Sequence, residues 1–143
     1  MKIILASQSP RRAALLDLAQ IDFEVMPSSF EEKIKSGMNI EEQAQELAYG
    51  KALEVFNNTQ GNRTIIGADT IVVKNNKVYG KPKDRAEAIK MLKELQGDYH
   101  VVYTSLAILI EDHDEYKEYR ELSNNISGIE TPFILCKKSI CIA

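Results

Sequence analysis

The sequence is poor in the residues that mark several large classes of protein. It has no tryptophan, two cysteines and four prolines among its 143 residues. The two cysteines, Cys136 and Cys141, form neither a disulfide framework nor a zinc pattern. No apolar run approaches the length of a membrane span, and Met1 to Ala6 is too short and too weakly basic for a signal peptide. These absences favour a cytoplasmic protein with no membrane partner.

The sequence also lacks an excess of positive charge. Its formal net charge is −3, with 27% charged residues of both signs. Proteins that bind nucleic acids normally present a net basic face, and those that bind single strands interleave it with aromatic residues. We therefore expect no nucleic-acid partner. With 44% hydrophobic residues, a chain of this length is expected to bury the core of one domain.

The periodicity of apolar residues indicates strands and helices in alternation. Strands are expected at residues 3–6, 23–26, 64–73, 77–79, 100–110 and 116–121, and helices at 10–19, from Asn39 to the loop at 57–62, and at 85–96. Asn39 with Glu42 is a capping arrangement, and Asn75-Asn76 is a turn signal. This order predicts an α/β fold, with a mixed, twisted β-sheet flanked by helices.

The turn after the first strand carries the strongest local signal for a bound anion. It reads Ser7-Gln8-Ser9-Pro10-Arg11-Arg12, with Ser9 at the expected cap and Pro10 at the first helical position. The start of a helix binds anions, and two guanidinium groups match phosphate oxygens in charge and geometry. The alternative is a capped helix with two surface arginines. Both interpretations stay open at this point.

Acidic residues give two further candidates. Asp69 follows Gly67-Ala68 inside a run of β-branched residues, where a carboxylate is costly to bury unless it is paired or binds a metal. It is a candidate to bind Mg²⁺ or to activate a water, and the alternative is an aspartate in a local turn. Glu31 and Glu32 lie in a polar stretch, where paired acids are normally solvated, although one could be a metal ligand.

Two lysines complete the set of candidates. Lys81 lies between Gly80 and Pro82 on a rigid loop, where it could neutralise a phosphate or simply be exposed. Lys51 falls on the apolar side of the second expected helix, where a lysine usually extends its ammonium group to solvent.

Taken in order, these segments resemble the Maf-type nucleoside triphosphate pyrophosphatases. The similar segments are Ala6 to Arg12, Glu31-Glu32, Ala48 to Ala52, Gly67 to Val72, Gly80 to Pro82 and His100 to Thr104. The resemblance implies a Maf/ITPase-like fold and hydrolysis of a nucleoside triphosphate to the monophosphate and pyrophosphate, with Mg²⁺ or Mn²⁺ as cofactor.

The resemblance also implies a role for each candidate residue. Asp69 would be the catalytic base and, with Glu32, would hold the metal. The triphosphate would be contacted by the hydroxyl and cationic side chains of Ser7, Arg11, Arg12, Lys51 and Lys81. Arg11 and Thr70 resemble the residues of the family branch that acts on dTTP and UTP.

The resemblance stops near Ser123. Residues 1–123 are therefore expected to form an incomplete Maf-like domain, and residues 124–143 a divergent tail. The tail has none of the family's later motifs, Gly-Glu-Pro, Asp-Lys-Ala-Gly and Ile-Gln-Gly, as a truncated or frameshifted product would. The family is also connected with inhibition of septum formation. A non-catalytic nucleotide-binding or septum-regulating protein, or a decayed copy, is thus the alternative, and a homodimer is left open.

Overall fold

The computed structural model describes residues 1–30, 37–113 and 115–128. The chain divides into two compact units. Among the described residues, the first unit contains those of 1–69 and 105–122, and the second contains those of 70–104 and 123–128. Each unit is described by itself below.

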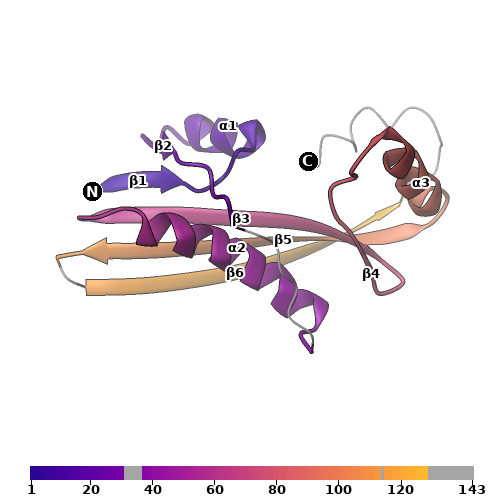
Figure 1. Ribbon diagram of the computed structural model, residues 1–143. Coiled ribbons are helices and arrows are strands. Elements are labelled where there is room, and N and C mark those ends of the chain that lie inside the picture. Colours follow the sequence, from indigo (N-terminus) through magenta and orange to yellow (C-terminus); the bar gives the residue numbers. More distant parts are fainter. Residues whose placement is uncertain (31–36, 114, 129–143) are drawn as a thin grey trace. The chain divides into compact units, whose positions relative to one another are not determined.

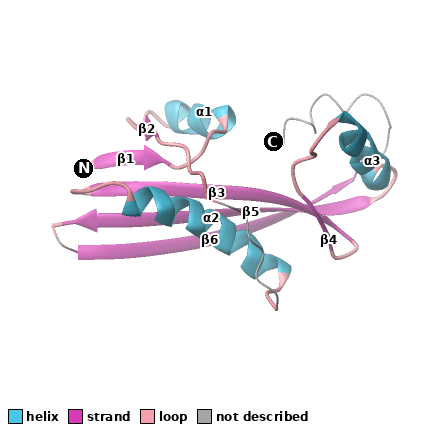
Figure 2. Cartoon of the chain, in the orientation of Figure 1, coloured by secondary structure: helices cyan, strands magenta, loops and turns pink. Residues whose placement is uncertain are grey.

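Strands and helices alternate along the described residues, as the sequence predicts (Figures 1 and 2). The elements are β1 (Lys2–Leu5), α1 (Pro10–Leu18), β2 (Glu24–Val25), α2 (Ile40–Asn57), β3 (Arg63–Lys74), β4 (Lys77–Tyr79), α3 (Arg85–Leu95), β5 (Tyr99–Asp112) and β6 (Glu115–Gly128). The strand order is β2-β1-β3-β5-β6, with β4 paired to β3. Because β1 is parallel to β2 and β3, and β4 is antiparallel to β3, the expected mixed α/β sheet is confirmed.

Helix α2 begins with the capping box that the sequence predicts. The backbone N–H of Glu42 donates to Asn39 Oδ1 at 2.8 Å, and the backbone N–H of Asn39 donates to Glu42 Oε2 at 3.0 Å. These two bonds satisfy donors that have no partner within the helix. The buried face of α2 is formed by Ala44, Leu47, Ala48, Gly50, Ala52 and Val55.

Small side chains let α2 lie very close to β3 in the first unit. A Cβ atom added to Gly67 would come within 2.8 Å of both the backbone nitrogen and the Cβ of Ala52. The core around this contact includes Ile4, Ala48, Ile65 and Leu109, all buried to 1% exposure or less. This close approach carries the residues on either side of Ala52, including Lys51, up to the strand that bears Asp69.

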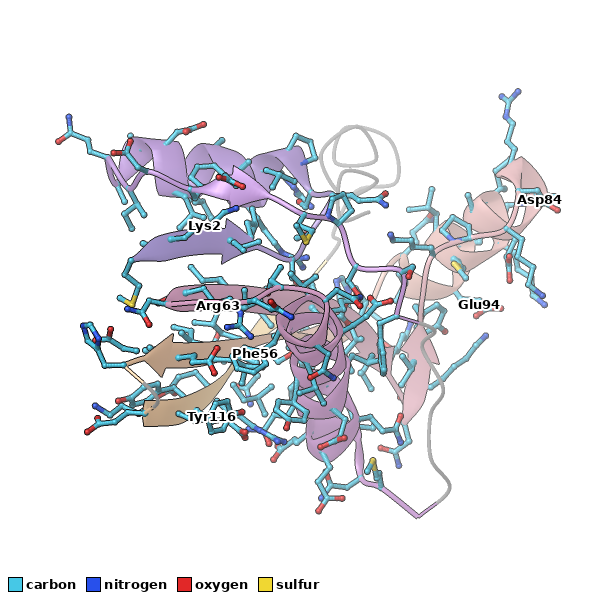
Figure 3. All side chains as sticks on the ribbon, turned by 60° about the vertical axis from the view of Figure 1, so that its left-hand side comes forward. Lys2, Phe56, Arg63, Asp84, Glu94 and Tyr116 are labelled. Carbon is cyan, nitrogen blue, oxygen red and sulfur yellow. The ribbon has the colours of Figure 1, made fainter. Side chains whose placement is uncertain are left out.

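An arginine at the start of β3 stabilises the loop between α2 and β3 by hydrogen bonds to its backbone. Arg63 donates to the backbone oxygens of Phe56 at 3.0 Å and Gly61 at 2.7 Å, and pairs with Glu111 on β5. Its guanidinium lies 4.0 Å from the centre of the Phe56 ring, and the rings of Phe56 and Tyr116 on β6 pack in a T-shaped arrangement with their centres 5.5 Å apart. Figure 3 shows Arg63, Phe56 and Tyr116 together. This cluster fixes the end of α2 over the sheet.

The second unit is built on the hairpin of β3 and β4. Asn75 and Asn76 both have positive φ angles, 50° and 60°, as a tight two-residue hairpin turn requires. Helix α3 is capped by Asp84, whose Oδ1 accepts from the backbone N–H of Glu87 at 2.8 Å. Glu94, labelled with Asp84 in Figure 3, accepts from the hydroxyl of Tyr79 at 2.9 Å and so ties α3 to β4.

Candidate functional site

The turn between β1 and α1 folds Arg12 back toward the end of the strand. Ser7 is 7% exposed, and its Oγ accepts from Arg12 Nη1 at 2.9 Å and from the backbone N–H of Ser9 at 3.2 Å. Burial lowers the pKa of Arg12, although the nearby Asp69 carboxylate acts in the opposite direction. Arginine nevertheless stays protonated in proteins. The turn therefore holds a fixed positive charge beside Asp69.

Asp69 is a buried carboxylate paired with a lysine. It is 8% exposed, and its Oδ1 accepts from Lys51 Nζ on α2. The side chains of Lys51 and Asp69 are only 16% and 11% exposed. The sequence left open whether the Lys51 ammonium extends to solvent. The structure instead places it on Asp69, where the partner's charge offsets the cost of burial.

Strand pairing explains why Ser7 and Asp69 come together. Strands β1 and β3 are parallel, with Leu5 opposite Ile66, and the N–H of Ala6 donates to the oxygen of Ile66 at 2.8 Å. Ser7 and Asp69 follow this pair, so both lie toward the carboxyl ends of the paired segments. In open α/β sheets, ligands bind at that edge.

The first unit thus gathers four of the predicted residues, Ser7, Arg12, Lys51 and Asp69. Two cations, a hydroxyl and a carboxylate form one small cluster. Such a cluster is suited to a phosphate group, whose oxygens accept from guanidinium, ammonium and hydroxyl donors. Arg11 lies next to the cluster in sequence and is exposed on α1.

The remaining predicted residues lie elsewhere. Thr70 opens the second unit, and its Oγ1 lies 3.3 Å from Thr104 Oγ1 within that unit. Lys81 is exposed in the loop after β4, also in the second unit. Glu32, with its neighbour Glu31, falls outside the described residues. The roles of these residues, like those of the clustered four, stay predictions.

The chemistry of the donors is compatible with a divalent metal bound together with a phosphate. Within residues 1–30, 37–113 and 115–128, no group of three or more acid, histidine or cysteine side chains could hold a metal. Asp69 contributes one buried carboxylate. Mg²⁺ is commonly held by only one or two carboxylates, with waters and substrate phosphates completing its shell. A single carboxylate beside cations fits that arrangement better than it fits a site made wholly of protein ligands.

Sequence reasoning missed two contacts, one in each unit. It did not foresee that Thr70 faces Thr104, although both lie in segments that it singled out. It also gave no role to Glu54, whose carboxylate accepts from the hydroxyls of Ser28 and Ser29. No local pattern signals these bonds, because their partners are 25 or more residues apart.

No helix in the described part of the chain has both the length and the apolar character needed to cross a membrane.

Comparisons with known proteins agree on one family. The model for the family described as "Maf-like protein" matches residues 2–128. A "dTTP/UTP pyrophosphatase" of Alkaliphilus oremlandii is 50% identical over 108 residues, which are 76% of this chain and 56% of that protein. The protein of the same name from Aquifex aeolicus is 42% identical over 129 residues, 86% of this chain and 67% of its own.

The chain spans little more than half the length of several of these relatives. Among solved structures, a nucleoside-triphosphatase / dITP/XTP pyrophosphatase from Mycobacterium abscessus superposes with a TM-score of 0.51 at 17% identity. The superposition covers 90% of this chain and 72% of the other. At that identity the likeness concerns the fold alone.

Proposed function

Because this chain belongs to the Maf-like protein family, we propose that it hydrolyses nucleoside triphosphates to the monophosphate and pyrophosphate. The observation that carries the proposal is the buried Asp69 carboxylate, which pairs with the Lys51 ammonium and lies near the positive charge of Arg12, toward the carboxyl ends of two parallel strands. Such a cluster supplies the two requirements of the reaction, which are charge to bind the triphosphate and a base to activate water.

The cationic side chains would bind the triphosphate. Arg12, Ser7 and the backbone N–H groups at the start of α1 would bind phosphate oxygens, with Arg11 and Lys81 adding further positive charge. Lys51 pairs with Asp69 in the free protein, and we expect its ammonium also to contact the triphosphate when the nucleotide binds. Within the first unit, substrate charge would then be neutralised from α1 and α2.

Asp69 would act as the base in the hydrolysis step. Asp69 would accept a proton from the attacking water as the water oxygen bonds to the α-phosphorus. The bond from the α-phosphorus to the bridging oxygen would break, and pyrophosphate would leave with its charge stabilised by the neighbouring cations. When bound through Asp69 and Glu32, a divalent metal such as Mg²⁺ or Mn²⁺ would neutralise phosphate oxygens.

The expected substrates are dTTP and UTP. One observation supports this choice: relatives at 50% and 42% identity carry the name dTTP/UTP pyrophosphatase. The resemblance of Arg11 and Thr70 to that branch agrees with it.

A pyrophosphate-release assay tests the function. The purified chain is incubated with dTTP, UTP, CTP, GTP, ATP and 7-methyl-GTP, with Mg²⁺ or with a chelator. We expect release with dTTP and UTP that the chelator abolishes. Release of orthophosphate in place of pyrophosphate, or nucleotide binding without any release, would exclude the proposed reaction.

A further inference from the structure

Strand β6 lies at the edge of the sheet, beside β5 (Figure 1). In the part of the chain that the structure describes, no strand pairs with its other side. Within the first unit this edge runs from Glu115 to Leu122. Tyr116 and Tyr119 on it are 50% and 54% exposed. Such an edge presents unpaired backbone N–H and C=O groups, with which a further strand can pair.

The side chains of β6 alternate between the two faces of the sheet, and both faces carry charge. Arg120 lies on the face covered by α2, where it donates to Glu46 Oε1 at 3.1 Å and stacks 3.7 Å from the centre of the Tyr49 ring. On the same face it donates to Glu118 Oε1 at 2.6 Å. The opposite face carries the alternate residues, all exposed, which are Glu115, Lys117, Tyr119 and Glu121.

Symmetry limits the ways in which two copies of β6 can pair. A two-fold axis perpendicular to the sheet makes the two strands antiparallel, and it requires that each contact be made twice, once from each copy. Residues directly opposite each other in an antiparallel pair point to the same face of the sheet. Every opposed pair therefore joins two odd-numbered or two even-numbered residues, and the axis must pass through one residue of β6.

Among axes through the middle of the edge, residues 117–120, one brings opposite charges together on both faces. It passes through Tyr119. An axis through Lys117, Glu118 or Arg120 would place a charge directly against its own copy, which destabilises strand pairing. With the axis at Tyr119, the opposed pairs are Lys117 with Glu121, Glu118 with Arg120, Tyr116 with Leu122, and Tyr119 with its own copy. Each charged pair occurs twice because of the symmetry.

We propose that β6 forms the interface of a homodimer, in which two copies pair antiparallel about Tyr119 and join their sheets. A second copy is the occupant that the observations favour, because the edge is complementary to itself. Backbone hydrogen bonds would supply the affinity, and the side chains would select the register. Charges on an edge strand often prevent pairing. Here they oppose the neighbouring registers and support this one. The inference does not involve Asp69, so it stands or fails independently of the proposed function.

The main experiment reverses one charge of the interface. Analytical ultracentrifugation of the full chain over a range of concentrations gives the dissociation constant of a species with twice the 16.1 kDa mass of the chain. Lys117→Glu should raise that constant about tenfold or more, because it places a glutamate against Glu121 of the second copy at two points. Glu121→Lys should act similarly. Lys93→Glu, the same change on the exposed face of α3, is the matched control and should keep the wild-type constant.

Exchanging the two charges separates an interface effect from damage to a single chain. Lys117 also pairs with Glu115 at 3.2 Å within one chain, so its replacement alone changes more than the interface. The double variant Lys117→Glu/Glu121→Lys restores opposite charges across the axis and should dimerise like the wild type. An equimolar mixture of the two single variants should form a heterodimer, since glutamate then faces lysine at both points. Neither recovery is expected if the single replacements act only within one chain.

A cysteine at the axis tests the register. In a chain with Cys136 and Cys141 replaced by serine, Tyr119→Cys places two thiols directly opposite each other, and oxidation should link the two copies. Lys117→Cys should not link to itself, because its copy lies about 13 Å further along the paired strand. The linked dimer is detected by electrophoresis without reducing agent.

Three results would overturn the inference. The first is a wild-type chain that stays monomeric at every concentration. The second is a dimer whose dissociation constant is unchanged in both Lys117→Glu and Glu121→Lys, which would move the interface to another surface. The third is linkage of Lys117→Cys in place of Tyr119→Cys, which would contradict the register about Tyr119.

Discussion

Strand β3 carries two charged side chains that are both buried, yet their surroundings differ. Arg63, at the first residue of the strand, is 4% exposed, and Asp69, six residues later, is 8% exposed. Arg63 meets one carboxylate, Glu111, two backbone oxygens and the face of Phe56. Asp69 pairs with Lys51 and lies near the charge of Arg12, in a cluster that includes the Ser7 hydroxyl.

From this difference we expect the ion pair of Arg63 to be structural, and we propose that the ion pair of Asp69 serves a ligand. Around Arg63 the charges balance, and the backbone oxygens that it binds belong to the end of α2 and the loop before β3. Arg63 therefore stabilises the fold of the segment between α2 and β3. Around Asp69 two cationic side chains, Lys51 and Arg12, gather at the ligand-binding edge of the sheet, where an anion would be attracted. We expect replacements at Asp69 to reduce activity and replacements at Arg63 to reduce stability.

The largest expected effect is on turnover in Asp69→Asn. Removal of a general base typically reduces kcat about 10²–10⁴-fold. Nucleotide affinity should stay near that of the wild type, since the cations that would bind phosphate remain. Pyrophosphate release gives kcat, and calorimetric titration with dTTP gives the dissociation constant. If affinity fell as much as kcat, Asp69 would serve in binding rather than as the base.

The opposite result is expected at Arg63. Arg63→Met should reduce the free energy of unfolding by about 2–3 kcal/mol, because two backbone oxygens and Glu111 lose a charged donor. The KM for nucleotide should not change. Denaturant unfolding and steady-state kinetics measure the two quantities, with Arg85→Met on the exposed start of α3 as control. A large rise in KM without loss of stability would reverse the comparison.

A smaller effect, on stability, is expected at Asn39, the residue that caps the start of α2 and belongs to neither charge cluster. Asn39→Ala should cost about 1 kcal/mol of stability, since it removes the side-chain half of the capping box. Lys51 lies three helical turns further along α2, so kcat and KM should be unaltered. Thermal unfolding and pyrophosphate release check both parts. A marked loss of activity would indicate that the whole of α2, and not only its middle, positions Lys51.

The smallest effect is expected at His100, a buried histidine whose pKa is shifted by burial and by a neighbouring positive charge. Burial lowers the pKa of His100, and the positive charge of Lys74 lowers it further. A lowered pKa in the folded state means that His100 favours folding above its unfolded pKa, near 6.5, and that this stability is lost as the pH falls. Unfolding free energies at pH 7.5, 6.5 and 5.5 should therefore decline.

His100→Gln should flatten that decline, whereas His113→Gln should leave it unchanged, because the His113 side chain is 86% exposed. An identical decline in the wild type and His100→Gln would assign the pH dependence to other groups.

Most of the secondary structure was predictable because its signals are local. The capping pair Asn39 and Glu42, the turn at Asn75-Asn76 and the cap at Asp84 each depend on residues within four positions of one another. The last strand was predicted too short, at 116–121 instead of Glu115–Gly128. Its later residues, including Ser123 and two asparagines, have low strand propensity, and pairing with β5 overrides that preference.

The site was only partly predictable, because its contacts are not local. Sequence reasoning identified Ser7, Arg12, Lys51 and Asp69 as candidates, but the spacing of Lys51 and Asp69 does not reveal that they pair. That contact depends on the close packing of Ala52 against Gly67. Arg63 received no role, since an arginine beside a loop looks like a surface residue. The domain boundary near residue 123 and the roles of Glu32 and Lys81 stay predictions.

Hydrolysis of dTTP in ¹⁸O-labelled water tests the proposed reaction most directly. Attack by water on the α-phosphorus places the label in the monophosphate and leaves the pyrophosphate unlabelled. We predict that pattern for the wild-type chain with Mg²⁺, detected by mass spectrometry. Label in the pyrophosphate would move the attack to another phosphorus, and the cluster around Asp69 would then not perform the proposed reaction.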